Sequence, residues 1–405
     1  MRPVVTVDQR RARLGRRHAL AQRVADPVAA AEAVVALHAT DPASVYLSAA
    51  ARCAEPSIEA VADALYRDRT LTRVLGMRRT LFVVPTRHLL VVERSSTVTV
   101  AENERRKLLT FLAAGGVDDP ATWLAEAAAE IEAALPPEGA SARQLTALVP
   151  RLATKLVMGA GTKNEAVAGA TSRVVAVLAS EGVLIRGTLT GSWTGRQYRW
   201  YRRSDWLDGV PPPDGDPEAE QAAAVELVRR WLGAFGPGSV ADLAWWTGWT
   251  LTKVRAALTR IETVEVDLDG DSGLVLADDV DDLLGDGGGD GGGAGLEPWV
   301  ALLPALDPTP MGWKERAWYL GPHKERLFDR NGNVGPTVWA DGRIVGGWGQ
   351  RSDGSIAVGL LDDIGTEHRR LLVAETERLA GLLGHTVVKP SFPTPLQREL
   401  AAGNP

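Results

Sequence analysis

Apolar residues near the start of the chain first recur at helical spacing and then alternate with polar ones. Residues 27–40, PVAAAEAVVALHAT, carry Ala and Val on most faces, which predicts a buried helix that ends before Asp41. Residues 57–71 keep helical spacing behind Ser57, a candidate N-cap. Residues 71–85, LTRVLGMRRTLFVVP, alternate and are β-branched and aromatic, which predicts two paired strands. Helices followed by a short basic ribbon are the order expected of a winged helix.

The same order of elements is predicted twice more along the chain. Residues 141–150 favour the first helix of a helix-turn-helix, residues 164–187 a long helix that runs into a strand, and residues 193–203 a basic, aromatic strand. Between residues 236 and 278, Ser239 can cap a helix, LTKVRAALTRI has helical spacing, and two short strands flank an Asp-Gly turn. The pattern predicts three diverged units, each a helix-turn-helix with a β-ribbon.

Two linkers and a β-rich C-terminal part complete the pattern. Residues 209–220 are rich in Pro, Gly and acids, and a later segment is a low-complexity run of Gly and Asp. Short alternating strands after it predict a small β-barrel or sandwich, followed by an amphipathic helix. The fold class is therefore α+β. The predicted domains are winged helices at 1–115, 116–208 and 217–280, a flexible Gly/Asp-rich loop at 281–297, and a C-terminal β-barrel with its helix at 298–405.

Composition indicates an ordinary globular protein. Of the 405 residues, 45% are hydrophobic and 24% are charged. A single cysteine, Cys53, argues against a disulfide framework and a multi-cysteine zinc site. The first residues lack the apolar stretch of a secretory signal, and no run approaches the roughly 18 apolar residues of a membrane span. We therefore expect a cytoplasmic protein that contacts no membrane.

Charge is distributed in blocks, although the formal net charge is only −6. Residues 1–110 hold 18 Lys and Arg against 11 Asp and Glu, a local charge of +7. Residues 140–205 hold 10 against 3, again +7, whereas residues 206–300 hold 5 against 19, which is −14. Basic blocks separated by acidic stretches indicate one surface that faces a polyanion. Chance clustering of surface arginines is the alternative.

Arginines at strand spacing in the two basic ribbons are the candidate DNA contacts. They can bind phosphates, and the aromatic residues between them can stack on bases or insert between them. In the alternative interpretation, the ribbons are solvated and their aromatic side chains face the core. The candidates are Arg73, Arg78 and Arg79 in the first ribbon and Arg196, Arg199, Arg202 and Arg203 in the second, where Tyr198, Trp200 and Tyr201 alternate with them.

Neither a nucleotide site nor a metal site is predicted. The glycine run GAGTKN at 159–164 lacks the spacing and the terminal Gly-Lys-Ser/Thr of a phosphate-binding loop, so we interpret it as a turn before the next helix. The histidines show no ligand spacing with one another or with Cys53. We therefore expect no cofactor.

Four segments carry a family resemblance: LHATDPASVYLSAAAR (37–52), LGMRRTLFVVP (75–85), GPGSVADLAWWTG (236–248) and LFDRNGNVGPTVWADGRIVGGWGQ (327–350). Together, and in this order over nearly the whole chain, they resemble the winged-helix DNA glycosylase superfamily of the AlkZ/YcaQ type. The resemblance implies three tandem winged helices and a β-barrel that form a concave DNA-binding surface. For some members it also implies excision of alkylated purines or unhooking of crosslinks.

The chain departs from that superfamily at the residues that would carry the chemistry. Characterised members have Gln-x-Gln or Gln-x-Asp where this chain has His38 and Thr40. Glycosidic hydrolysis needs a water positioned at C1′ and stabilisation of an oxocarbenium-like state. His38 can accept a proton or orient that water, Thr40 can hold it, and Asp41 can supply negative charge. Alternatively, His38 bonds a neighbouring strand, Thr40 closes the helix, and no catalysis remains.

Further side chains are predicted to surround this site. Arg52, with Arg78 and Arg79, is expected to hold the phosphates that flank a damaged nucleotide. The turn DRNGNVG is either only a turn between strands or a device that presents two side chains to the minor groove, Arg330 and Asn331.

Two functions from different classes stay open at this level, beside a third possibility, a protein-interaction scaffold whose binding to duplex DNA would be no tighter at low salt than at high salt. In the first, the protein is a DNA N-glycosylase that excises bulky or cationic alkylpurines from duplex DNA by water attack at C1′. A cationic base is already a good leaving group, so modest activation of water suffices. In the second, it binds DNA without catalysis, as a transcriptional regulator or damage-shielding factor. The expected partner is double-stranded, damaged DNA, and the expected state is a monomer.

Overall fold

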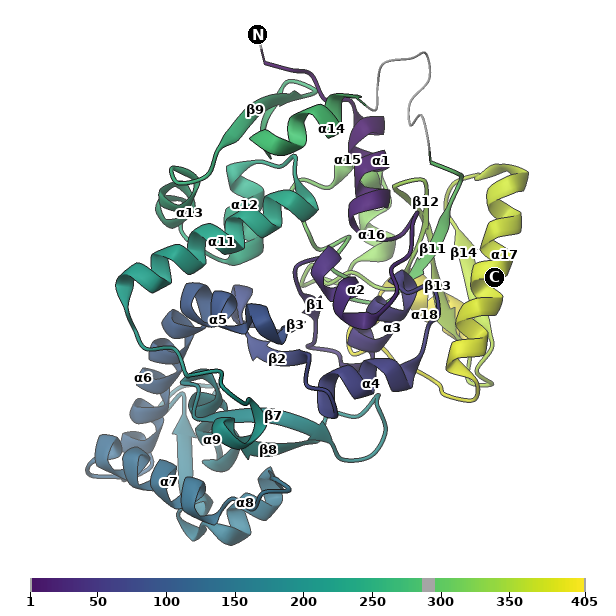
Figure 1. Ribbon diagram of the computed structural model, residues 1–405. Coiled ribbons are helices and arrows are strands. Elements are labelled where there is room, and N and C mark those ends of the chain that lie inside the picture. The colour runs from purple at the N-terminus through teal and green to yellow at the C-terminus, as the bar shows by residue number, and fades with distance from the viewer. Residues whose placement is uncertain (1, 286–295, 404–405) are drawn as a thin grey trace.

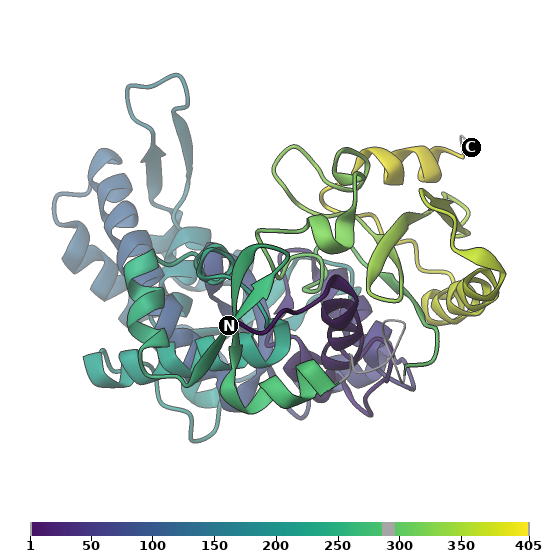
Figure 2. The same cartoon turned by 90° about the horizontal axis from the view of Figure 1, so that it is seen from above.

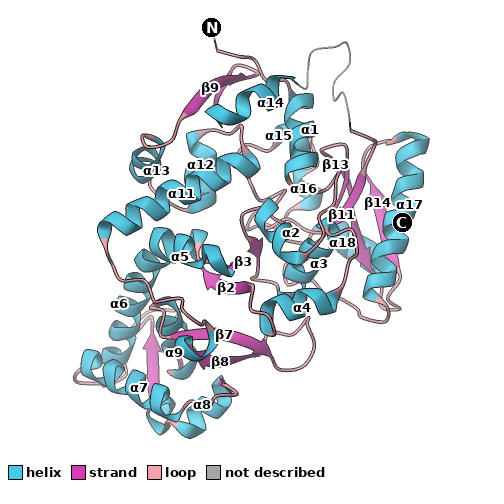
Figure 3. Cartoon of the chain, viewed as in Figure 1, coloured by secondary structure: helices cyan, strands magenta, loops and turns pink. Residues whose placement is uncertain are grey.

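The structure, a computed structural model, describes residues 2–285 and 296–403. Helices surround several small antiparallel sheets, which makes this a mixed α/β chain (Figures 1 and 3). Within the described residues, no helix is long and apolar enough to cross a bilayer. Most of the predicted Gly/Asp-rich loop, residues 286–295, lies outside the described residues. The start of that loop is helical instead: α14 spans Val280–Gly285, and it buries Leu283.

The first unit of the fold contains the helix and the strand pair predicted at 57–85. Its elements are α2 (Pro27–Ala33), β1 (Leu37–His38), α3 (Pro42–Arg52), α4 (Ile58–Tyr66), β2 (Leu71–Leu75) and β3 (Leu81–Pro85). Ser57 starts α4 by accepting a hydrogen bond from the Ala60 N–H, as an N-cap should. β2 and β3 form an antiparallel hairpin, and β1 joins it to give the sheet order β1-β3-β2.

The predicted helix at 27–40 is wrong in its second half. α2 ends at Ala33, and residues 37–38 pair with β3 as a short edge strand. Between them, Val35 takes a left-handed φ of 65°. The apolar run has helical spacing, but the free edge of β3 offers backbone hydrogen bonds that a local pattern does not reveal. His38 therefore lies on a strand and not on a helix.

The second unit contains the predicted short helix and aromatic strand, with an added hairpin. Its elements are α6 (Val98–Ala114), α7 (Pro120–Ala134), β4 (Ala140–Ser141), α8 (Ala142–Leu148), β5 (Lys155–Met158), β6 (Ala166–Gly169), α9 (Thr171–Ser180), β7 (Leu184–Leu189) and β8 (Tyr198–Arg202). Residues 166–169 are a strand and not the predicted start of a long helix. β5 and β6 form a hairpin that projects from the body (Figure 2), and the run GAGTKN makes its tip, with Gly159 and Gly161 at positive φ.

The third unit forms as its sequence predicts. Its elements are α11 (Pro217–Phe235), α12 (Val240–Thr247), α13 (Leu251–Leu258), β9 (Thr263–Leu268) and β10 (Asp271–Leu276). Ser239 and Asp242 make a reciprocal capping box at the start of α12. Gly238, just before this cap, pairs with Leu274 of β10.

One topology recurs in all three units. Each has a helix, a short extended segment, two further helices and a hairpin, and the extended segment pairs with the second strand of that hairpin. The pairs are β1 with β3, β4 with β8, and Gly238 with β10. Units too diverged for visible sequence repeats therefore share the same hydrogen-bonding plan.

The C-terminal part is a four-stranded antiparallel sheet covered by helices. Its elements are β11 (Val300–Leu303), β12 (Thr337–Ala340), β13 (Arg343–Gln350), β14 (Ile356–Leu360), α17 (Gly365–Leu383) and α18 (Pro395–Ala402). The strand order is β11-β12-β13-β14, with β11 and β14 as the outer strands. The predicted strands and helix are present, whereas closure of the sheet into a barrel is not confirmed. α17 packs beside β11 (Figure 1).

A shared core joins the first unit, the third unit and the C-terminal sheet, and the second unit has a core of its own. Leu37 of β1, Trp231 of α11 and Trp339 of β12 all belong to the shared core and are fully buried. At its centre, Arg52 at the end of α3 pairs with Asp307, and neither side chain has any exposed surface. This pair fixes α3, and the β1 strand before it, against the C-terminal part.

Candidate active site

The segment from His38 to Thr40 lies at the junction of β1 and α3. Asp41 is the N-cap of α3, because its Oδ1 accepts a hydrogen bond from the Ala43 N–H at 3.3 Å. Pro42 follows in the first helical turn, where its fixed φ suits a helix and its missing N–H costs nothing. Cap and proline together start the helix sharply, so the chain leaves the sheet at Thr40 in a fixed direction.

His38 is almost fully buried, with 6% of its surface exposed. Its ring packs edge-on against Phe82 at 5.0 Å, and its Nδ1 accepts the Thr40 N–H at 3.4 Å, which assigns the ring proton to Nε2. Burial, with a contribution from the positive charge of Arg78, lowers the pKa of His38 to about 3. At neutral pH His38 is thus an uncharged hydrogen-bond donor, a state suited to orienting water and unsuited to accepting a proton.

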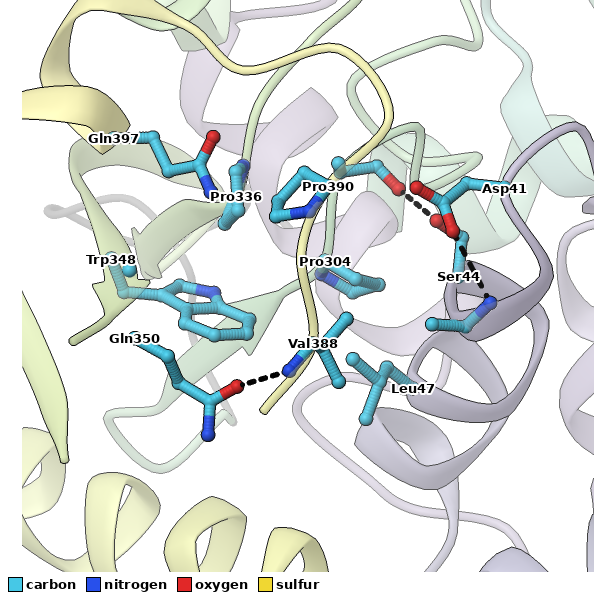
Figure 4. Close-up of a pocket in the computed structure, with 13 residues that line it drawn as sticks. Asp41, Ser44, Leu47, Pro304, Pro336, Trp348, Gln350, Val388, Pro390 and Gln397 are labelled. Atoms are coloured by element: carbon cyan, nitrogen blue, oxygen red, sulfur yellow. Dashed lines mark hydrogen bonds between the residues drawn. The ribbon is translucent and has the colours of Figure 1, made fainter. Parts of the chain in front are cut away.

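Both carboxylate oxygens of Asp41 are engaged. While Oδ1 caps α3, Oδ2 accepts hydrogen bonds from the N–H and the hydroxyl of Ser391 at 2.8 and 2.7 Å. Asp41 lines a small pocket together with Trp348 and Val388 (Figure 4). Gln350 accepts the Val388 N–H at 2.8 Å and holds that wall in place. Asp41 therefore anchors the C-terminal segment. Because both of its oxygens already accept hydrogen bonds, it can act on a reaction only through its negative charge.

Two arginines lie against one tryptophan beside His38. The guanidinium carbons of Arg78 and Arg316 are 4.3 and 4.6 Å from the ring centre of Trp245. Burial, with the nearby charge of Arg316, lowers the pKa of Arg78 to about 10. Within the described part of the chain, neither arginine has a carboxylate at ion-pair distance. Asp242 and Glu315 contribute negative charge near Arg316 from beyond that distance. Two partly desolvated cations without a direct ion-pair partner make this a candidate site for a phosphate.

Trp245 and Arg316 are not among the residues predicted from the sequence. Trp245 belongs to the motif GPGSVADLAWWTG, and helical spacing separates it from the buried Leu243 and Trp246 of α12. That spacing is a usable signal, because a half-buried tryptophan beside a core tryptophan points to a surface contact. Arg316 gave no such signal, since its position depends on the packing of the C-terminal part against α12.

Three of the predicted DNA contacts are enclosed by the fold. Arg52 donates to both oxygens of Asp307 at 2.8 and 2.7 Å. Arg203 makes a similar double contact with Glu93 at 2.7 and 2.8 Å, and Arg73 is 5% exposed. Burial of these three side chains corrects the prediction that they hold DNA phosphates, because DNA cannot reach them in this conformation.

Other predicted contacts lie at the surface. Arg79 is exposed and pairs with Glu104. Arg196 is exposed and donates to the hydroxyl of Ser391, the residue that also bonds Asp41. Both side chains are accessible to DNA, and their role stays a prediction.

The remaining residues predicted to contact DNA differ in how strongly the rest of the protein restrains their side chains. Arg199 and Arg202 donate to backbone carbonyls of the second unit. Arg330 and Asn331 are exposed in a turn that Asp329 closes by accepting backbone N–H groups. The turn geometry is therefore confirmed, and contact of these four residues with DNA remains a prediction.

The aromatic residues of the second ribbon follow the alternative interpretation in part. Trp200 and Tyr201 are 6% and 8% exposed and belong to the hydrophobic cores. Tyr198 is only half-buried, and the guanidinium of Arg73 lies 4.9 Å from its ring centre. Of the three, Tyr198 has a ring that a ligand can reach.

Two buried histidines predict acid sensitivity of the fold. His18, like His38, has a pKa of about 3, because it is buried and lies near the positive charge of Arg52. In the unfolded chain both histidines ionise near pH 6.5, so the unfolded state binds more protons as pH falls and stability decreases. From about pH 7 to about pH 5, we expect each histidine to lower the free energy of unfolding by about 2 kcal/mol.

Urea denaturation of the parent and of His18→Gln at both pH values measures this effect. Glutamine does not titrate, so the free energy of unfolding of the variant should fall less between the two pH values, by the amount that one histidine contributes. An unchanged pH dependence in the variant would contradict the buried, neutral state of His18.

Comparison with known proteins shows both the fold and the family. The chain shares its fold with the Streptomyces sahachiroi DNA glycosylase AlkZ, at a TM-score of 0.70 and 20% sequence identity, over 95% of this chain and 98% of that chain. Residues 31–382 match the family described as DNA glycosylase AlkZ-like. The chain therefore belongs to the AlkZ-like DNA glycosylases, hydrolases of N-glycosidic bonds in DNA. The resemblance seen in the sequence is confirmed. No curated protein matches the sequence significantly.

Proposed function

We propose that this DNA glycosylase excises alkylated purines from duplex DNA by directing a water to C1′, with His38 and Thr40 as the pair that positions the water. The observation that carries the proposal is their placement where β1 meets α3, beside Arg78 and Arg316, two cations that form no ion pair in the described part of the chain. Thr40 is half-buried, so it lies within reach of solvent, and neutral His38 has an Nε2–H to donate.

A neutral pair is sufficient when the leaving base is cationic. The C1′–N bond breaks, the base departs as a neutral purine with the bonding electrons, and the sugar becomes oxocarbenium-like. The oriented water adds to C1′ and releases its proton to solvent. The fixed negative charge of Asp41, although its oxygens are already bonded, favours the cationic sugar through space. No step needs a group that titrates near neutral pH.

We further propose that the three units are winged helices at 1–115, 116–208 and 217–280, followed by a barrel-like domain at 298–405. Their common strand pairing supports this assignment. In a winged helix the last helix of the helical pair enters a groove and the hairpin flanks it, so α4, α9 and α13 would face DNA. Damaged double-stranded DNA, bound by a monomer, fits the basic blocks at 1–110 and 140–205.

The proposed activity predicts lesion-dependent formation of abasic sites. A duplex with one N7-methylguanine, incubated with excess protein, is expected to release that base at least about 100-fold faster than spontaneous loss. Alkaline cleavage of the labelled strand measures the abasic product. The matched unmodified duplex is the control and should stay intact. Base release no faster than in buffer, for this lesion and for a bulkier N7 adduct, would contradict the proposal.

A further inference from the structure

A hollow in the second unit gathers arginines without acids. It lies between the start of α8, the start of α9 and the hairpin β7–β8, and it is open to solvent, with a volume of about 480 Å³. Arg143, Arg186 and Arg196 line it, and no Asp or Glu is among its lining residues. Ser172, Gln197 and Tyr198 add polar groups to the same wall.

The arginines around this hollow have no direct ion-pair partner among the described residues, and the nearest carboxylate shown, that of Asp41, is reached only through Ser391. Arg186 lies 5.3 and 4.9 Å from the ring centres of Tyr198 and Trp200, and burial lowers its pKa to about 10. The guanidinium carbon of Arg73 lies 4.9 Å from the ring centre of Tyr198, and the buried Nε and Nη2 of Arg73 have no hydrogen-bond partner. In the described part of the chain, Arg73, Arg143, Arg186 and Arg196 form no ion pair. Cations held this way are stabilised when an anion binds.

The hollow adjoins the candidate active site through one chain of hydrogen bonds. Arg196 donates to the hydroxyl of Ser391, and Ser391 donates to the Asp41 carboxylate. Asp41 directly follows Thr40 and caps α3. A strand that brings a nucleotide to Thr40 therefore has its neighbouring phosphates within reach of these arginines.

We propose that this hollow binds the phosphodiester backbone of the DNA strand that carries the target nucleotide. The inference rests on the proposed function and specifies where that strand is held. Arg143 and Arg196 are exposed and bind phosphates directly. Arg186, held between two aromatic rings, supplies a fixed positive charge at the floor of the hollow. Guanidinium groups suit this role because they donate two parallel hydrogen bonds to phosphate oxygens.

Salt-dependent binding of a labelled, unmodified duplex tests the inference by fluorescence anisotropy. Each phosphate contact contributes about one unit to the slope of log affinity against log salt. The double variant Arg143→Gln/Arg196→Gln is expected to lower that slope by about 2 and the affinity by at least about tenfold at low salt. Both side chains are exposed, so thermal unfolding should not change.

The matched control is Arg326→Gln/Arg369→Gln, which removes the same charge from the C-terminal part. These arginines pair with Glu399 and Asp363 at 2.6 and 2.9 Å, so slope and affinity should equal those of the parent. Arg186→Lys keeps the charge at the floor of the hollow and is expected to keep the slope. If the parent binds with a steep slope and the hollow variant behaves like the control, the inference is overturned and the proposed function stands. If the parent itself shows no salt-dependent binding, both are overturned.

Discussion

The Asp307→Asn variant is expected to lose about 3 to 5 kcal/mol of unfolding free energy, measured by urea denaturation. Asp307 accepts two hydrogen bonds from Arg52, and neither side chain is exposed. Asparagine keeps the shape of the side chain but removes its negative charge, so the guanidinium stays buried without a counter-ion. The loss is large because water cannot reach the orphaned cation.

Two comparisons show whether burial is the cause. Arg67→Gln breaks an ion pair with Asp63, but the Arg67 side chain is 70% exposed, so the expected loss is below about 1 kcal/mol. Arg52→Met/Asp307→Leu leaves no buried charge and should recover part of the stability lost in the single variant. A loss below about 1 kcal/mol in Asp307→Asn would show that the pair does not hold α3 against the C-terminal part.

The His38→Phe variant is expected to excise an alkylated purine about 100-fold more slowly than the parent under single-turnover conditions. Phenylalanine keeps a flat ring against Phe82, so packing is retained, but it lacks the Nε2–H that would orient the water. Affinity for the duplex should change little, because the arginines proposed to contact phosphates are untouched.

His38→Gln is the matched variant, since an amide N–H can replace the imidazole N–H. It also restores the glutamine that characterised members carry at this position, and we expect its rate to stay within about tenfold of the parent. Because the pKa of His38 is about 3, the parent's rate should show no inflection from this residue near neutral pH. Full activity of His38→Phe would exclude the assigned role. An inflection near pH 6.5 that His38→Gln removes would assign proton transfer to His38 instead.

Local features of the fold were predicted well because their causes lie within a few residues. The Ser57 and Ser239 caps each bond a backbone N–H three residues ahead. The hairpins at β2–β3 and β9–β10 follow from alternation around a turn. The family, too, was visible in the sequence, because its motifs are continuous segments. The helix predicted through His38 failed because strand pairing with β3, more than forty residues away, outweighed the local spacing.

The sequence could propose where a site lies but could not give the chemical state of its residues. Its segment, His38 to Asp41, could be placed by motif, yet the neutral state of His38 follows from burial against Phe82 and from Arg78. The basic ribbons supplied candidate contacts, and only packing separated the enclosed Arg73 from the exposed Arg196.

By itself, the sequence determined the caps at Ser57 and Ser239, the hairpins β2–β3 and β9–β10 and the family, and it proposed a site at residues 38–41. Those properties depend on periodicity, caps and contiguous motifs, all of which are local. The tertiary structure alone decided which cations are free. Arg52 meets its counter-ion 255 positions along the chain, whereas Arg78 and Arg316 are brought together on Trp245 and form no ion pair with any described carboxylate. Burial and ion pairing depend on all the residues that are close in space, and these cannot be read from the spacing of residues along the chain.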